Sequence, residues 1–349
     1  MHMADALISP TVGGLMWAAS AGLLAYSSSK LKSSLDDRRV PLMGVLGAFI
    51  FAAQMINFSI PGTGSSGHLG GGLILAALLG PHAAFLTIAS VLAVQGLFFA
   101  DGGLLAMGCN IINMGFFSCY VAYPLIYKPL TGANPTRTKL MSASVIAATV
   151  GLQFGAFGVV LETLASGISD LPFSSFVLLM QPIHLAIGLV EGVVTAMLLV
   201  FLHKARPELF SAVQPAGTSA PLRPVVIGLA LAALVVGGGL SWFASADPDG
   251  LEWATAKVSG KEELEAPATG IHGTLDALQK QIAFLPDYNL KQSEAAPATA
   301  DRAQPEEAKA EPWPNIEAGK SLAGVVGGFM TLCLAGMLGV VLRKKHSKA

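Results

Sequence analysis

Long apolar runs separated by short polar segments dominate the hydrophobic pattern of the chain. A helix needs about 20 apolar residues to cross a hydrocarbon layer about 30 Å thick, so these runs predict a membrane protein. The candidate spans are Thr11 to Tyr26, Pro41 to Phe58, His68 to Leu79, His82 to Ala100, Leu104 to Tyr127, Leu140 to Ala165, Ser175 to Leu202, Pro224 to Ala244 and Ser321 to Leu342. The third run is short, and the Gly80-Pro81 break after it could equally mark a re-entrant or broken helix.

Positive charges gather on alternate loops of this pattern. They follow the first, fifth, seventh and ninth spans, at Lys30, Lys32, Arg38, Arg39, Lys128, Arg137, Lys139, Lys204, Arg206, Arg223, Arg343, Lys344, Lys345 and Lys348. The other loops, at 59–67, 101–103 and 166–172, contain neither Lys nor Arg. Cytoplasmic loops accumulate positive charge, so the pattern predicts an N-terminus on the outer side of the membrane.

A change of composition divides the chain into two membrane units. The Pro- and Ala-rich segment Pro207 to Pro221 predicts a cytoplasmic linker, with boundaries at 1–206, 207–223 and 224–349. The second unit holds a polar, extracytoplasmic stretch from Asp247 to Lys320, and its Ala-, Pro- and Glu-rich tract Ser293 to Pro314 should be disordered. The expected fold is an all-α membrane protein with a seven-helix bundle and a two-helix unit.

Composition narrows the functional classes. Of 349 residues, 53% are hydrophobic and 12% charged, which does not suit a soluble globule because those are about 25% charged. The net charge of -1 gives no general attraction to nucleic acid. Cys109, Cys119 and Cys333 show no metal or redox spacing. The first ten residues hold Asp5 but no Lys or Arg, so a signal peptide is not predicted and Met1 should be retained.

The first two residues offer a chelating group. The Met1 amine, the amide nitrogen of residue 2 and the His2 imidazole can close fused five- and six-membered rings around one ion. Three coplanar nitrogens with a deprotonated amide suit Ni(II) or Cu(II), whereas Zn(II) prefers tetrahedral sites and Mg(II) prefers oxygen. The alternative is that His2 is an incidental surface residue.

A fourth ligand is available in the Gly-rich loop from Pro61 to Gly72, on the same predicted side of the membrane. His68 is the candidate, and three hydroxyl side chains of the loop could orient its imidazole through hydrogen bonds: Thr63, Ser65 and Ser66. The loop could instead be a flexible turn. A phosphate-binding loop is less consistent with the sequence because the Lys of a P-loop is missing.

Three segments carry a family resemblance: Met1 to Pro10, the loop ending in Gly67-His68-Leu69, and Asp101 to Asn110 followed by Asn113-Met114. Over about Met1 to Arg206 the chain resembles the substrate-binding subunit of nickel and cobalt energy-coupling-factor transporters. The resemblance implies a metal held by the terminal amine, the residue-2 amide and imidazole, and a loop histidine. Those ligands fall on Met1, His2 and His68.

The second unit carries its own motif, made of Pro248, Asp249, Gly250, Leu251 and Glu252. Pro-Asp-Gly alone indicates only a turn. The full pentapeptide resembles the motif of the small two-span accessory subunit of the same transporters. The chain is therefore similar to a fusion of both subunits, with the accessory part near 224–345.

Polar residues within the apolar runs are further candidates. Asp101 could support the metal ligands, or it could be a helix-end cap or a hydrogen-bond anchor. Asn57, Asn110 and Asn113 could orient the terminal segment or His68, as could Gln54 and Gln95, although plain interhelical hydrogen bonding explains these amides as well. Glu162 and Glu191 could attract a dication or pair within the bundle. Gly44, Ala48 and Ala52 form a small-residue face that could dock a coupling subunit or pack internally.

Together these features predict a metal transporter component rather than an enzyme. The expected substrate is Ni(II), or alternatively Co(II), and no permanently bound cofactor is expected. No Walker motif occurs, so the resemblance implies a pair of partner ATPases acting through a transmembrane coupling subunit in a bacterial or archaeal cytoplasmic membrane. Rival readings are an ATPase-independent carrier or channel and an intramembrane metalloenzyme, for which no His-Glu-x-x-His motif is present.

Overall fold

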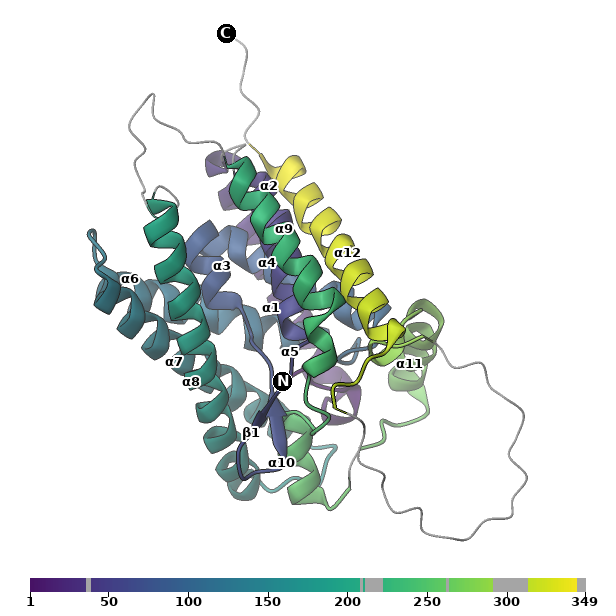
Figure 1. The fold of residues 1–349 in the computed structure, drawn as a ribbon. Coiled ribbons are helices and arrows are strands. Elements are labelled where there is room, and N and C mark those ends of the chain that lie inside the picture. The colour runs from purple at the N-terminus through teal and green to yellow at the C-terminus, as the bar shows by residue number, and fades with distance from the viewer. Residues whose placement is uncertain (36–38, 208–209, 211–221, 262–263, 291–312, 344–349) are drawn as a thin grey trace.

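The computed structural model describes the chain except residues 36–38, 208–209, 211–221, 262–263, 291–312 and 344–349 (Figure 1). Most of the predicted linker and the predicted disordered tract lie outside the described residues. The first unit comprises η1 (Asp5–Leu7), α1 (Pro10–Ser34), α2 (Val40–Gln54), β1 (Phe58–Ile60), β2 (Ser65–Gly67), α3 (Gly72–Leu79), α4 (Pro81–Phe98), α5 (Met107–Asn110), η2 (Ile111–Tyr127), α6 (Lys128–Thr131), α7 (Arg137–Ser166) and α8 (Phe173–Ala205). The second comprises α9 (Arg223–Gly238), η4 (Leu240–Phe243), α10 (Gly250–Ser259), α11 (Gly270–Ile282), η5 (Pro286–Tyr288) and α12 (Ala318–Leu342).

The helical, multi-span character of the chain is confirmed. Five helical segments in the described part of the chain are long and apolar enough to cross a membrane: 81–98, 107–131, 137–166, 173–205 and 318–342. Two shorter apolar helices, α2 and α9, add to them. The expected count of seven plus two spans and the outward N-terminus stay predictions.

The third predicted span differs from the expectation. Only Gly72–Leu79 is helical there, and eight residues extend about 12 Å, less than half of the hydrocarbon thickness. Gly80 has φ of 82°, in the region that glycine tolerates, and Pro81 starts the next helix. The break between α3 and α4 is real, and the segment before it is a short buried helix.

The two units pack together along α2, where α9 and α12 lie beside it (Figure 1). A Cβ added at Gly44 would lie 2.9 Å from the Leu332 carbonyl oxygen, so the backbones of α2 and α12 approach closely. Ala48 and Ala52 of the same face cluster with Ala233 of α9. This small-residue face therefore packs internally against the second unit and is not an open docking surface for a coupling subunit.

The N-terminal strand enters the bundle between the two units. The Met3 amide donates to Asn110 Oδ1 (2.8 Å), and the Met3 carbonyl accepts from the Gly103 amide (2.9 Å). The second unit contacts this N-terminal segment as well, since His272 of α11 lies 2.8 Å from the Ile8 carbonyl oxygen. Met1 and Met3 are consequently buried, and the terminal amine lies inside the protein beside β1 and β2 (Figure 1).

Candidate metal site

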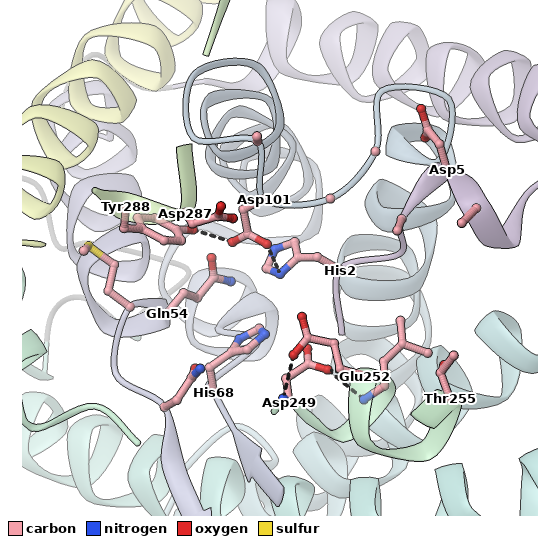
Figure 2. A pocket seen from close by; sticks show the side chains of 18 of the residues that line it. His2, Asp5, Gln54, His68, Asp101, Asp249, Glu252, Thr255, Asp287 and Tyr288 are labelled. Carbon is pink, nitrogen blue, oxygen red and sulfur yellow. Dashed lines mark hydrogen bonds and ion pairs between the residues drawn. The ribbon is translucent and has the colours of Figure 1, made fainter. Parts of the chain in front are cut away.

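The terminal amine meets His68 and the accessory motif at one point. The Met1 nitrogen lies 3.1 Å from His68 Nε2 and forms an ion pair with Asp249 Oδ2. The rings of His2 and His68 stack with centroids 5.1 Å apart and planes 19° from parallel. The structure thus brings the three predicted ligand residues to one place and adds a carboxylate from the second unit. Figure 2 shows His2, His68 and Asp249 around this point.

The His68 tautomer is fixed by its own backbone. Its Nδ1 lies 3.1 Å from the Leu69 carbonyl oxygen, which can only accept a hydrogen bond, so Nδ1 carries the proton. Nε2 then presents its lone pair to the Met1 amine. Burial, followed by repulsion from the ammonium and His2, holds the His68 pKa well below its usual range, so the ring is neutral at neutral pH.

The His2 tautomer is fixed by a relay of two amides. Gln54 Nε2 donates to the Gly70 carbonyl (2.9 Å), which fixes which end of this amide is the donor. Gln54 Oε1 must then accept from Gln95 Nε2 (2.9 Å), and Gln95 Oε1 accepts from His2 Nε2 (3.2 Å). The proton of the neutral His2 ring therefore sits on Nε2, and Nδ1 keeps a lone pair. Burial lowers the His2 pKa despite the opposing charge of Asp101.

The free nitrogen of His2 faces a carboxylate. His2 Nδ1 lies 3.2 Å from Asp101 Oδ1, and Tyr288 donates its hydroxyl to Asp101 Oδ2 (Figure 2). A lone pair facing a carboxylate oxygen is an arrangement that a nearby cation would stabilise. Nδ1 is also the nitrogen that a six-membered chelate ring through the residue-2 amide requires.

Tyr288 reaches this position through an unusual backbone. Asp287 and Tyr288 have φ of 50° and 59°, in the left-handed region that costs a non-glycine residue about 1–3 kcal/mol. The segment is held by the Asp287 amide, which donates to the Phe99 carbonyl (2.9 Å). The Tyr288 ring also stacks on Phe99 with centroids 5.2 Å apart.

Asp249 is held at the start of helix α10. Its Oδ1 accepts from the Leu251 and Glu252 amides (2.8 and 2.9 Å), and Glu252 Oε2 accepts from the Asp249 amide in return. Burial disfavours the charged carboxylate most strongly, yet the ammonium and His68 together with these hydrogen bonds hold the Asp249 pKa well below its usual range. The motif thus combines a capping box with a charge aimed at the amine.

The accessory motif is pinned to the His68 loop. The Ser66 amide donates to the Pro248 carbonyl (2.7 Å), which makes a parallel bridge next to Asp249. Trp253 Nε1 donates to the Thr63 carbonyl (3.0 Å). The hydroxyls of the loop therefore play a different part from the one expected. Ser66 Oγ donates to the Asp247 carbonyl (2.7 Å). The hydroxyls of Thr63 and Ser65 donate instead to backbone carbonyls nearby in the sequence.

Most of the other predicted polar residues contact either the N-terminal segment or the His68 loop. Asn110 holds the Met3 backbone, and Asn113 Nδ2 lies 3.7 Å from Met3 Sδ while donating to Glu162 (2.6 Å). Glu191 accepts from the amides of Gly70 and Gly71 (2.9 and 3.0 Å) and so anchors the loop just after His68. The Asn57 carbonyl accepts from Ser245 in the second unit (2.8 Å).

A cavity of about 600 Å³ lies next to His2 and His68, between the two units. Its described lining includes one lysine, Lys320, and six carboxylates, at Asp5, Asp101, Asp249, Glu252, Asp276 and Asp287. Four of these six belong to the second unit. The space beside the imidazoles is therefore walled by acids, which favours the approach of a cation.

Among the described residues no group of three His, Cys, Asp or Glu side chains is arranged to hold a metal ion. The converging donors are instead a terminal amine and two imidazoles. Sequence reasoning missed two contacts, Asp249 to the amine and Tyr288 to Asp101. The signal for the first was the pentapeptide itself, whereas the second depends on a distant segment.

Comparison with known proteins assigns both units. The family model described as "Cobalt uptake substrate-specific transmembrane region" matches residues 2–209, and the "PDGLE domain" matches residues 223–344. A "Fused nickel transport protein NikMN" of Rhodobacter capsulatus is 31% identical over 313 residues, which cover 82% of this chain and 88% of the relative. A "Cobalt transport protein CbiM" of Geobacter sulfurreducens is 28% identical over 68% of this chain and 72% of its own.

A solved structure adds to these relatives. The crystal structure of a truncated transition metal transporter is 30% identical, with a TM-score of 0.52 over 59% of this chain and 99% of its own. The fold and these relatives define the class as a multi-pass membrane transport protein rather than an enzyme. Within that class the chain belongs to the CbiM family of cobalt-uptake substrate-specific transmembrane proteins and carries a fused PDGLE domain.

Proposed function

We propose that the chain captures Ni(II) with high affinity from the outer side of the membrane. The ligands are the Met1 amine, the residue-2 amide, His2 Nδ1 and His68 Nε2. The observation that carries this proposal is the pair of fixed tautomers. One nitrogen of each imidazole donates a hydrogen bond, directly or through two amides, that leads to a backbone carbonyl. The other nitrogen, which the metal needs, therefore keeps its lone pair.

The spacing of the donors supports the same ligand set. Two nitrogens that each lie about 2.0 Å from one ion and at right angles are about 2.8 Å apart. The Met1 nitrogen and His68 Nε2 are 3.1 Å apart in the absence of any ion, so metal binding requires little movement of this pair. The buried, neutral imidazoles need not lose a proton first.

Nickel is preferred over cobalt because of the donor set. A planar arrangement of nitrogens with one deprotonated amide suits Ni(II), which accepts square-planar coordination. Cobalt uptake in the same kind of system is the alternative, and it is favoured by the cobalt transport proteins among the relatives. The Rhodobacter capsulatus relative, which covers 82% of this chain, is named as a nickel transport protein.

Energy for transport comes, in this proposal, from a pair of ATPases that act through a transmembrane coupling subunit in a bacterial or archaeal cytoplasmic membrane. The basis is that the sequence holds no phosphate-binding loop with the required lysine. An ATPase-independent carrier or channel is the rival. Uptake of labelled nickel by cells with and without the ATPases separates the two, since transport undiminished without them contradicts the coupled function.

The substrate is tested by calorimetric titration of the purified full chain with Ni(II), Co(II) and Zn(II). We expect one high-affinity site and the order Ni(II) above Co(II) above Zn(II). A chain that binds Co(II) more tightly than Ni(II) supports the alternative substrate. A chain that binds neither ion refutes the proposed function.

A further inference from the structure

The two oxygens of the Asp249 carboxylate serve different partners. Oδ1 accepts from two amides at the start of α10, and Oδ2 pairs with the Met1 ammonium. The backbone bridge between Ser66 and Asp249 fixes the same residue against the His68 loop. The carboxylate is therefore held in place by the fold, and its second oxygen is committed to the amine.

The ion pair between Met1 and Asp249 is largely buried. The side chains of Met1 and Asp249 are 4% and 14% exposed. A buried ammonium without a counter-charge costs several kcal/mol. Among the described residues Asp249 is the carboxylate that forms an ion pair with this amine, while Asp101 of the first unit contacts His2 and Tyr288.

We propose that Asp249 is the permanent counter-charge of the metal site, paired with the ammonium when the site is empty and with the coordinated amine when it is loaded. This inference rests on the ligand set proposed above. On loading, one N–H bond of the ammonium and the N–H bond of the residue-2 amide break, both protons leave to solvent, and four metal–nitrogen bonds form. No electron is transferred.

The charge next to Asp249 is the same in both states. An ammonium of charge +1 is replaced by a dication bound to one amidate, which also carries +1. The coordinated amine keeps two N–H bonds and can still donate to Oδ2, so Asp249 does not have to become a ligand. Asp249 is a positioning residue, and the accessory unit thereby completes a site that the first unit leaves without its counter-charge.

The test compares three variants of the full chain by calorimetric titration with Ni(II). Asp249→Asn removes the charge and keeps a good helix cap, and Asp249→Ala removes both. Glu265→Gln, the control, removes an exposed carboxylate of the second unit that is not part of the described cavity lining. We expect both Asp249 variants to bind about 10- to 100-fold more weakly than the wild type, by similar factors. Glu265→Gln should bind as the wild type does.

The visible spectrum of each nickel-loaded variant separates a counter-charge from a ligand. An unchanged band in Asp249→Asn at saturating metal supports the counter-charge, and a shifted band overturns it in favour of direct ligation. Wild-type affinity in Asp249→Asn, an effect confined to Asp249→Ala, or an equal loss in Glu265→Gln also overturns it. If Asp249→Asn lowers the unfolding midpoint markedly, Asp249→Ser, a second capping residue, replaces it in the comparison.

Failure of this inference is distinguishable from failure of the proposed function. A wild-type chain that does not bind nickel refutes both. A wild-type chain that binds nickel tightly while Asp249→Asn binds equally well refutes only the role of Asp249.

Discussion

The two units contribute differently to the metal site. The first unit supplies the amine and both imidazoles and orients them through neutral hydrogen bonds that end on the carbonyls of Leu69 and Gly70. The second unit supplies the carboxylate on the amine and the hydroxyl on Asp101. Orientation of the ligands and compensation of their charge are thus separated between two parts of the fold, which allows each contribution to be removed on its own.

The largest expected effect comes from the first unit, at the amine itself. Adding one residue before Met1, or acetylating it, removes a ligand and shifts His2 out of chelate register. Removal of a residue that only supports a ligand lowers affinity about 10- to 100-fold, and the loss of nickel affinity here should be larger. Calorimetric titration of the extended chain measures it, with a C-terminal extension as the control.

Acid should weaken nickel binding by the next largest factor. The amine and the amide release protons on binding, so affinity falls as pH falls, by up to about 100-fold per pH unit when two protons are released. Burial lowers the pKa of His2 and holds that of His68 well below its usual range, so the two imidazoles add to this slope only at acidic pH. Titrations between pH 8 and pH 5 check the slope, and an affinity independent of pH over this range contradicts nitrogen ligation.

Gln95→Leu tests the orientation that the first unit provides. It removes the acceptor that holds the His2 Nε2 proton, so Nδ1 is no longer reserved for the metal. We expect nickel affinity to fall about 10- to 100-fold. Gln153→Leu is the matched control, because the Gln153 side chain donates to the backbone carbonyl of Gln181 (2.9 Å), on another helix, and not to a proposed ligand. Equal losses in the two variants would argue against the relay.

Tyr288→Phe gives the smallest expected effect and probes the second unit. The variant loses one hydrogen bond to a carboxylate, worth about 1.5 kcal/mol, so affinity should fall roughly tenfold or less. Tyr127→Phe is the control, since the Tyr127 hydroxyl is buried without a hydrogen-bond partner in the structure. A Tyr288 variant that binds nickel as the wild type does would show that this hydrogen bond does not support the site.

The apolar pattern predicted most of the helical architecture but not its short elements. Runs of apolar residues predicted α4, α7, α8 and α12 because a membrane span has a characteristic length. The run before Gly80 is equally apolar, and its helix is short because the Gly-rich loop anchored by Glu191 occupies the residues that a full span would need. Hydropathy alone does not register such an anchor.

The convergence of Met1, His2 and His68 could be predicted from the sequence, but the contacts that orient them could not. The order of atoms along the chain makes Met1 and His2 a possible chelate, and the family resemblance pointed to this pair together with the loop histidine. The tautomers depend on contacts such as Gln95 to Gln54, which join separate helices and leave no mark on local sequence. Likewise the small-residue face of α2 indicated close packing without showing that α12 is the partner.

The visible absorption spectrum of the nickel-loaded full chain tests the central claim most directly. Four nitrogens around Ni(II), one of them a deprotonated amide, should give the yellow ligand-field band of a square-planar ion. The same band should disappear in the chain extended before Met1. A weak green spectrum of a six-coordinate ion, unchanged by the extension, would contradict ligation by the amine, the amide and the two imidazoles.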